Sequence, residues 1–282
     1  MRLAGFVTIT RPVNSFVAGL AAIIAYLIDT GTVIPESLLL FFIVALITAA
    51  GNVINDFFDA EIDAINRPDR PIPSGAVSRG AARGFAVTLF LAGILVSFFT
   101  NPLCVGIAIF NTILLIAYAA KLKSTPLIGN IVVAYLAASI FLFGGALNGV
   151  EGIIRIIPVA AITFFAMVSR ELLKDAEDVE GDRTGGADTV PLRIGIKKTS
   201  EFALITTVLA VMVSFLPYFW WGAWYLGGII AVDIIIIIAA LRGLNCETPA
   251  CVKASKATSL LKVGMFASLV VFTLSAVFLS VR

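Results

Sequence analysis

A series of long apolar stretches limits the folds that this 282-residue chain can adopt. A helix crosses a hydrocarbon core about 30 Å thick with roughly 20 apolar residues. Nine stretches of about this length run approximately over residues 13–28, 36–57, 82–99, 103–119, 127–147, 153–173, 201–218, 222–242 and 258–280. The composition agrees, with 60% hydrophobic residues, 13% charged residues and a mean hydropathy of +1.03. We therefore predict an all-α, polytopic membrane bundle of about nine transmembrane helices.

The distribution of basic residues predicts the orientation of this bundle. Short loops on the cytoplasmic side retain Lys and Arg, and alternate connections of this chain carry nearly all of them. The long polar connections 59–81 and 174–200 are both basic, whereas the opposite ends offer only Arg155 and Arg282. We therefore predict a cytoplasmic N-terminus and an outside C-terminus. The two long connections are expected to form a cytoplasmic cap on a single domain that spans residues 1–282.

Two acidic triplets repeat along the chain and each ends a predicted helix. We call them the first stripe, Asp56, Asp59 and Asp63, and the second stripe, Asp175, Asp178 and Asp182, which follows at a constant offset of 119 residues. This repeat indicates two four-helix halves followed by a ninth helix. At about 100° per residue, the spacing i, i+3, i+7 confines three carboxylates to an arc of roughly 60° on one helix face. The members of each stripe should therefore point the same way.

The two stripes indicate a cation site. Carboxylates at a helix C-terminus oppose the helix dipole, and three on one face repel one another, so a bound cation would offset two unfavourable effects. Ligand sets made only of oxygen select hard ions such as Mg²⁺, which keeps water or phosphate oxygens in its remaining positions. Nearby Lys and Arg can bind further anionic oxygens. The pattern therefore indicates Mg²⁺ and a diphosphate ligand.

Other residue types narrow the function further. The chain contains no His, which excludes a histidine general base and any His-ligated metal or haem. Cys104, Cys246 and Cys251 show no metal-ligand spacing, and no disulfide framework is expected from them. Asp233 falls near the middle of the eighth stretch, where an ionisable group is costly. Because it lies far from the stripes, we expect a polar partner or a water pocket for it.

Several short motifs in the chain match the pattern of one known enzyme superfamily. Asn55-Asp56-x-x-Asp59-x-x-x-Asp63 and Asp178-x-x-x-Asp182 resemble the two signature motifs of the UbiA superfamily of intramembrane prenyltransferases. Arg11-Pro12-x-Asn14 resembles its opening motif. Asn66-Arg67-Pro68 with Arg70-Pro71 resembles its basic loop, and Tyr118-x-x-Lys121 resembles its tyrosine-lysine motif. The resemblance covers nearly the whole chain.

The resemblance implies roles for individual residues. The implied Mg²⁺ ligands are Asp56, Asp59, Asp63, Asp178 and Asp182. The catalytic set adds Asn55, and it adds Asp175 because the internal repeat pairs Asp175 with Asp56. The implied diphosphate-binding residues are Asn14, Arg67, Tyr118, Lys121 and Lys174.

Residues 170–183, followed by Thr189-Val190-Pro191, resemble the archaeal members of the superfamily that build ether lipids. This implies transfer of a geranylgeranyl group from geranylgeranyl diphosphate to the hydroxyl of geranylgeranylglyceryl phosphate, which is a lipid-like acceptor. The expected partners are these two substrates and membrane lipid, and no nucleic acid. Two alternatives stay open from the residues alone. One is an aromatic prenyltransferase that makes quinone precursors. The other is an ion-coupled transporter, whose site would lie near the membrane midplane.

Overall fold

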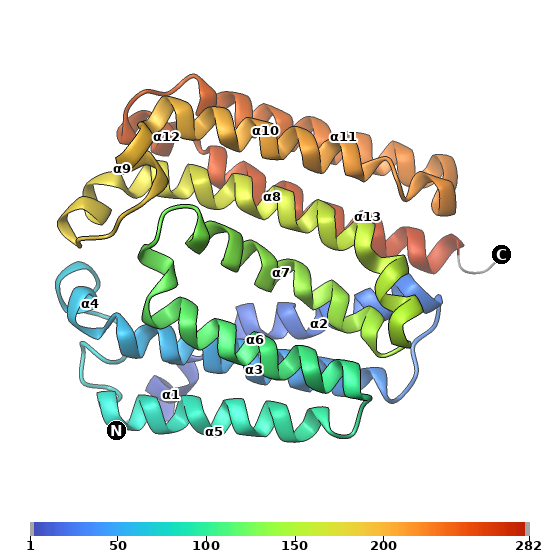
Figure 1. The fold of residues 1–282 in the computed structure, drawn as a ribbon, viewed down its shortest axis with the longest axis horizontal. Coiled ribbons are helices and arrows are strands. Elements are labelled where there is room, and N and C mark those ends of the chain that lie inside the picture. The colour runs from blue at the N-terminus through green and yellow to red at the C-terminus, as the bar shows by residue number, and fades with distance from the viewer. Residues whose placement is uncertain (1–2, 280–282) are drawn as a thin grey trace. The chain divides into compact units, whose positions relative to one another are not determined.

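The computed structural model describes residues 3–279, which form helices without any β-strand among them. Nine long helices match the nine predicted stretches (Figure 1). They are α2 (Pro12–Thr30), α3 (Ser37–Phe58), α5 (Arg79–Ser97), α6 (Pro102–Ala120), α7 (Ile128–Ala146), α8 (Gly149–Thr184), α10 (Ile196–Ser214), α11 (Tyr218–Leu244) and α13 (Ala257–Leu279). Shorter elements are α1 (Leu3–Ile9), α4 (Ala60–Asn66), the 3-10 helix η1 (Leu122–Ser124), α9 (Val190–Ile194) and α12 (Pro249–Ser255). Ser280 of the ninth stretch and Arg282 lie outside the described residues.

The helices confirm an all-α membrane fold, with two differences in detail. Eight helical segments among the described residues are long and apolar enough to cross a membrane. Helix α10 is not among them, because Lys197, Lys198 and Glu201 stand near its start. Helix α8 extends beyond its predicted apolar stretch, which ends at residue 173, and continues to Thr184, so that it contains the second stripe. The residues from 174 to 184 include no proline, and several of them, such as Ala176, Glu177 and Glu180, are good helix formers, so the helix can continue past its apolar part.

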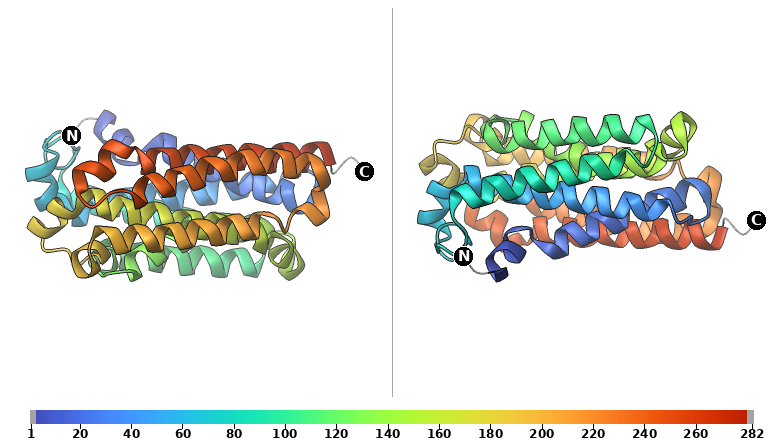
Figure 2. Two further views of the ribbon diagram at one scale, coloured as in Figure 1. Left: turned by 90° about the horizontal axis from the view of Figure 1, so that it is seen from above. Right: turned by 90° about the horizontal axis from the view of Figure 1, so that it is seen from below.

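One compact unit contains the first half of the chain. It comprises the residues up to Tyr26, Thr32–Lys121 and Leu142–Ile154. Within it α3 packs against both α5 and α6, and α5 lies beside α6 (Figures 1 and 2). A Cβ atom on Gly93 of α5 would lie 2.8 Å from Cγ1 of Ile47 on α3. Small residues of this kind let membrane helices approach closely, and packing then holds them together.

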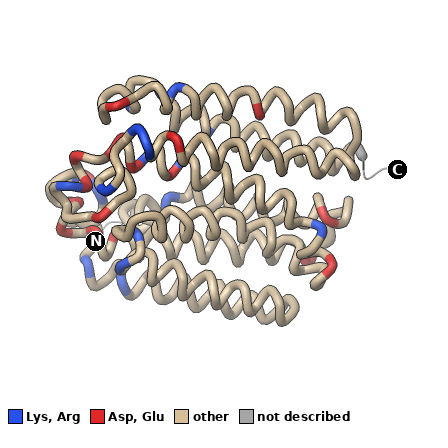
Figure 3. Tube along the Cα trace, turned by 45° about the horizontal axis from the view of Figure 1, so that its top comes forward, with Lys and Arg blue, Asp and Glu red and all other residues tan. Residues whose placement is uncertain are grey.

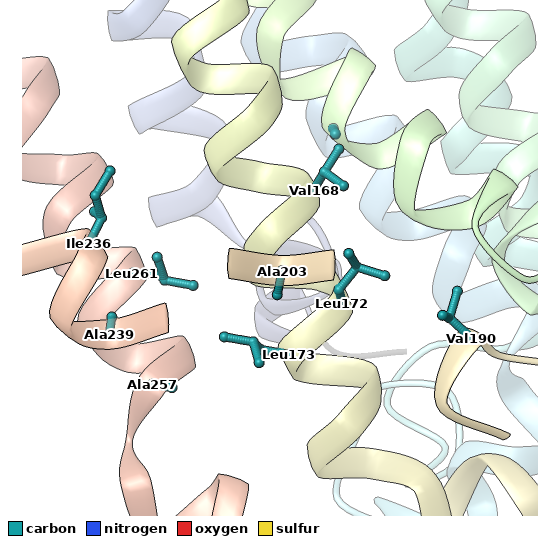
Figure 4. Close-up of a cluster of buried hydrophobic side chains, with 10 residues drawn as sticks. Val168, Leu172, Leu173, Val190, Ala203, Ile236, Ala239, Ala257 and Leu261 are labelled. Atoms are coloured by element: carbon teal, nitrogen blue, oxygen red, sulfur yellow. The ribbon is translucent and has the colours of Figure 1, made fainter. Parts of the chain in front are cut away.

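The second compact unit contains most of the second half. It comprises Leu27–Gly31, Leu122–Phe141 and the residues from Arg155 onward. Within it α11 packs against α10 and α13. Its core joins Leu172 and Leu173 of α8 to Ala203 of α10, Ile236 of α11 and Leu261 of α13 (Figure 4). These apolar contacts hold α8 in place up to Leu173, and the polar end of the helix follows directly after this residue.

Asp233 has the polar partner that its position in an apolar stretch requires. Its side chain is 5% exposed, and its Oδ2 accepts a hydrogen bond from Ser214 Oγ at 2.7 Å. Tyr225 donates its hydroxyl to the Ser214 carbonyl oxygen at 2.7 Å and is fully buried. Buried polar groups without partners are costly, so this network fixes the turn between α10 and α11. The expectation of a polar partner is confirmed.

Replacing Ser214 by alanine should therefore destabilise the protein without affecting the acidic stripes. The Asp233 carboxyl would remain buried without its donor, at a cost of about 1–3 kcal/mol in the free energy of unfolding. Thermal unfolding in detergent measures this loss. Ser268→Ala is the matched control, because among residues 3–279 the Ser268 hydroxyl donates only within its own helix, to Met265 O at 2.8 Å. Equal stability of the two variants would contradict the role of the network.

The cysteine expectation is wrong for two of the three residues. Cys246 and Cys251 form a disulfide across the turn between α11 and α12, whereas Cys104 is unpaired and buried. Thr248 caps α12 by accepting a hydrogen bond from the Cys251 backbone N–H at 3.3 Å. The cysteine spacing does not reveal this turn, which brings the two residues within disulfide distance. Cys246 packs against Ala176 of α8, one residue after Asp175.

Candidate active site

The first stripe lies where α3 passes into α4. Helical hydrogen bonds continue through this junction, from Asp59 N–H to Asn55 O at 2.9 Å and from Asp63 N–H to Asp59 O at 2.8 Å. Asp56 is 4% exposed and Asp63 is 6% exposed. Asn55 donates from Nδ2 to Asp59 Oδ2 at 2.9 Å, which fixes the carboxylate of Asp59. Of these four predicted residues, Asp56 and Asp63 are thus buried, and Asn55 and Asp59 are joined by a hydrogen bond.

Two arginines hold the buried carboxylates of the first stripe. Arg11 donates from Nη2 to Asp56 Oδ1 at 2.6 Å. Arg70 donates from Nη1 to the same Asp56 oxygen at 3.2 Å and to Asp63 Oδ2 at 2.5 Å. Because one guanidinium group reaches both carboxylates, Asp56 and Asp63 must lie on the same side of the α3–α4 junction. The predicted common direction is therefore observed for these two residues.

The backbone positions both arginines. Arg11 stands between α1 and α2 with a φ of 48°, a conformation that is unusual for a residue with a side chain. The residue before it is tied to α3, because Asn52 donates from Nδ2 to Thr10 O at 3.0 Å. Arg70 lies in a turn closed by hydrogen bonds from Arg70 N–H to Arg67 O at 3.0 Å and from Ser74 N–H to Arg70 O at 2.9 Å. The sequence prediction did not include either arginine in the site.

The second stripe lies entirely within α8. Asp175 accepts a hydrogen bond at its Oδ2 from Asn130 Nδ2 at 2.7 Å, and Asn130 is buried in the first turn of α7. Asp178 is exposed and Asp182 is half-buried. The backbone N–H of Asp188 donates to Ser124 O at 3.1 Å, which ties the segment after α8 to the segment before α7. Asn130 was not predicted, and no sequence motif marks it.

The cations closest along α8 are engaged by a different carboxylate. Arg170 donates to Glu171, and Lys174 Nζ lies 3.8 Å from Glu171 Oε2. Glu177 accepts a hydrogen bond from Thr258 Oγ1 of α13 at 2.7 Å, which attaches the polar part of α8 to its own unit. No ion pair to Asp175, Asp178 or Asp182 occurs within the part of the chain that the structure describes.

The predicted diphosphate-binding residues are less closely gathered. Asn14 and Arg67 are exposed, and neither has a side-chain hydrogen bond or ion pair to the carboxylates within residues 3–279. Tyr118 is half-buried near the end of α6, and Lys121 is the exposed residue that ends this helix. Lys174 is exposed and paired with Glu171. The arginine of this loop that contacts the first stripe is Arg70 and not Arg67.

The charged residues gather mainly at the ends of the helices, as Figure 3 shows. One further pair follows the second stripe, where Arg193 Nε donates to Asp188 Oδ1 at 2.9 Å. This hydrogen bond lowers the pKa of the Asp188 carboxyl below its ordinary value. The stripes thus lie in strongly polar surroundings next to long apolar helices, which suits a ligand with an anionic head and an apolar chain.

The donor set fits a magnesium ion that shares its ligands with a phosphate. Among the described residues, no three His, Cys, Asp or Glu side chains come close enough together to enclose a metal ion. Mg²⁺ does not require such an enclosure, because it retains water and substrate phosphate oxygens and takes only one or two carboxylates at a time. The buried oxygens of Asp56 and Asp63 already hold a cationic guanidinium group. They are therefore suited to positive charge.

Comparisons with known proteins agree with this geometry. Residues 15–278 match the UbiA prenyltransferase family. The chain is 63% identical over 279 residues to digeranylgeranylglyceryl phosphate synthase from Methanoregula boonei, with 99% of this chain and 100% of that protein covered. It is 57% identical over 278 residues to the protein of the same name from Methanoculleus marisnigri, with 98% of this chain and 100% of that protein covered.

Two solved structures have the same fold. One, of digeranylgeranylglyceryl phosphate synthase in membranes, is 37% identical, with a TM-score of 0.85 and 98% of each chain covered. The other is a UbiA homologue from Archaeoglobus fulgidus bound to GPP and Mg²⁺, which is 18% identical, with a TM-score of 0.70. That match covers 94% of this chain and 99% of the other and supports the fold. The all-α membrane architecture is therefore confirmed independently of the apolar pattern.

Proposed function

The chain belongs to the UbiA prenyltransferase family, and we propose that it transfers a geranylgeranyl group from geranylgeranyl diphosphate to geranylgeranylglyceryl phosphate. The observation that carries this proposal is the 63% identity, over essentially the full length of both proteins, to a digeranylgeranylglyceryl phosphate synthase. In this reaction the free hydroxyl oxygen of the acceptor bonds to C1 of the geranylgeranyl group. The C1–O bond to the diphosphate breaks, the diphosphate leaves with the electron pair, and the hydroxyl proton is released. The product has the second ether bond of an archaeal membrane lipid.

We propose that the carboxylates of each stripe bind Mg²⁺. Asp56, Asp59, Asp63, Asp178 and Asp182 are the proposed ligands, while Asn55 and Asp175 complete the catalytic set. Bound Mg²⁺ neutralises charge on the diphosphate and thereby favours its departure. The proposed contacts of the diphosphate are Asn14, Arg67, Tyr118, Lys121 and Lys174. We add Arg11 and Arg70 to this set, because both arginines contact the first stripe.

We also propose that the N-terminus and the stripes face the cytoplasm and that the C-terminus lies outside. The support for this is the basic composition of the connections next to both stripes. Reporter fusions that are active only on one side of the membrane test it when they are placed after Lys123 and after Asn148. Activity of the cytoplasmic reporter at Asn148 would reverse the orientation.

A transfer assay on purified protein in detergent tests the reaction. With geranylgeranyl diphosphate and Mg²⁺, we expect ether product from geranylgeranylglyceryl phosphate and none from an aromatic acid. A chelator should abolish product formation, and added Mg²⁺ should restore it, because the stripes would lose the cation that balances the diphosphate. Product only from the aromatic acid would assign the protein to the quinone-precursor branch. Absence of diphosphate release with both acceptors would favour the ion-coupled transporter instead.

A further inference from the structure

The two stripes differ in how their negative charge is balanced. In the first stripe the buried carboxylates of Asp56 and Asp63 share the Arg70 guanidinium group, and Asp56 also binds Arg11. In the second stripe the partner of Asp175 is the neutral amide of Asn130. Within residues 3–279, the aspartates of the second stripe form no ion pair. The first stripe therefore has a cation in direct contact with its carboxylates. Among the described residues the second stripe has none, because its neighbour Lys174 is paired with Glu171.

Arg70 occupies one oxygen of each of two buried carboxylates that are proposed metal ligands. Its Nη1 lies 3.2 Å from Asp56 Oδ1 and 2.5 Å from Asp63 Oδ2, and its side chain is 19% exposed. A Mg²⁺ ion that bound these oxygens would have to displace the guanidinium group, and removing one partner of a buried ion pair is costly. The displaced group needs another anion nearby. Without one, metal binding at the first stripe is opposed by the ion pair.

A diphosphate supplies that anion. Guanidinium groups bind phosphate oxygens through paired, charge-assisted hydrogen bonds of the same kind that they form with carboxylates. Arg70 can make this exchange by moving its side chain alone, because hydrogen bonds from its own N–H and from Ser74 N–H close the backbone turn around it. Transfer of the guanidinium group to the diphosphate would leave the carboxylates of Asp56 and Asp63 available to the metal ion.

Building on the proposed function, we propose that Arg70 is an internal counter-cation that keeps Mg²⁺ from the first stripe until a diphosphate binds. The second stripe has no such counter-cation and binds a divalent metal without diphosphate. Because coupling between two ligands is reciprocal, diphosphate and the metal at the first stripe strengthen each other's binding. The two stripes are thus filled in a fixed order, although their sequences repeat each other.

Metal binding without any substrate tests this proposal. Mn²⁺ serves as the probe, and electron paramagnetic resonance measures the free ion in titrations of purified protein in detergent. We expect the unaltered protein to bind Mn²⁺ through the second stripe, so that Asp178→Asn removes this binding. Arg70→Gln should bind Mn²⁺ at one additional site, the first stripe. The affinity for Mn²⁺ at this stripe should be at least tenfold higher than in the unaltered protein. That gain should disappear when Asp56→Asn is added.

A matched control separates local competition from the general effect of charge. Arg79→Gln removes one positive charge from the same unit, but Arg79 pairs with the exposed Glu61 and not with the stripe. It should leave Mn²⁺ binding unchanged. If Arg70→Gln does not fold, Arg11→Gln tests the same competition at Asp56 alone. Thermal unfolding gives a second readout, because Mn²⁺ should raise the melting temperature of Arg70→Gln more than that of the unaltered protein.

The outcomes distinguish this proposal from the proposed function. Equal Mn²⁺ binding by Arg70→Gln and the unaltered protein would overturn the counter-cation role, as would filling of both stripes in the unaltered protein without diphosphate. Neither result would affect the transfer assay or its acceptor. By contrast, an unaltered protein that binds no Mn²⁺, even with a non-cleavable geranylgeranyl thiodiphosphate present, would overturn the metal site on which both proposals depend.

Discussion

Replacing Asp178 by asparagine should lower prenyl transfer about 10²- to 10³-fold while the protein remains folded. Loss of one group that stabilises charge in a transition state costs about 3–4 kcal/mol, and each 1.36 kcal/mol is a factor of about ten in rate. Asp178 suits this test because it is exposed and its side chain forms no hydrogen bond or ion pair within the described residues. A reduced rate therefore reports on catalysis and not on folding. Initial rates at saturating diphosphate and Mg²⁺ measure it.

The control for this variant lies two residues away on the same helix. Glu180 is also an exposed carboxylate of α8, but it is not part of the second stripe. Glu180→Gln removes the same charge and should retain at least half of the activity. If Asp178→Asn were as active as Glu180→Gln, the second stripe would have no part in catalysis. If both variants lost activity equally, the effect would come from general charge at the end of α8.

The long helices could be predicted from the sequence because their main determinant is local. Each membrane span needs about 20 apolar residues, and this requirement is visible without knowledge of the neighbouring helices. The end of α8 does not coincide with the end of an apolar stretch, so only the helical spacing of the second stripe indicated that the helix continues past residue 173. Hydropathy identifies the part of a helix that contacts lipid, whereas helix propensity and tertiary contacts decide how far the helix continues. The contact of Thr258 with Glu177 is one such tertiary contact.

The carboxylates of the site were predictable, but their partners were not. Aspartate spacing within one helix fixes which side chains share a face, so both stripes could be identified from the sequence. The basic-loop motif contains both Arg67 and Arg70, and a diphosphate role was predicted for Arg67 alone. Which of the two reaches the first stripe depends on a turn that only the folded chain defines, and in the structure it is Arg70. Asn130 reaches Asp175 from a separate helix, at a sequence distance that no motif spans.

A second large effect is expected from adding a side chain to Gly144, which lies where α7 crosses α2. A Cβ atom at this position would lie 2.4 Å from the Ala25 Cβ, 2.6 Å from the Ala22 backbone oxygen and 3.0 Å from the Tyr26 nitrogen. Two of these three atoms belong to the backbone, so no side-chain rotation can relieve the clash. Gly144→Ala should lower the free energy of unfolding by about 1–3 kcal/mol, the usual cost of overpacking. Gly144→Leu should prevent recovery of folded protein.

The same glycine-to-alanine substitution on a neighbouring helix should not lower the free energy of unfolding. Gly106 lies within α6 of the same unit, and a Cβ atom there would meet nothing within 4 Å. Gly106→Ala should therefore be neutral or stabilising by up to about 1 kcal/mol, because alanine is the better helix former. Melting temperatures in detergent compare the two variants directly. If Gly144→Ala proved as stable as Gly106→Ala, α2 and α7 could not be as closely packed as the structure shows. Close packing matters at this position because apolar surface gives membrane helices no driving force to associate in lipid, so contact between the helices must hold them together.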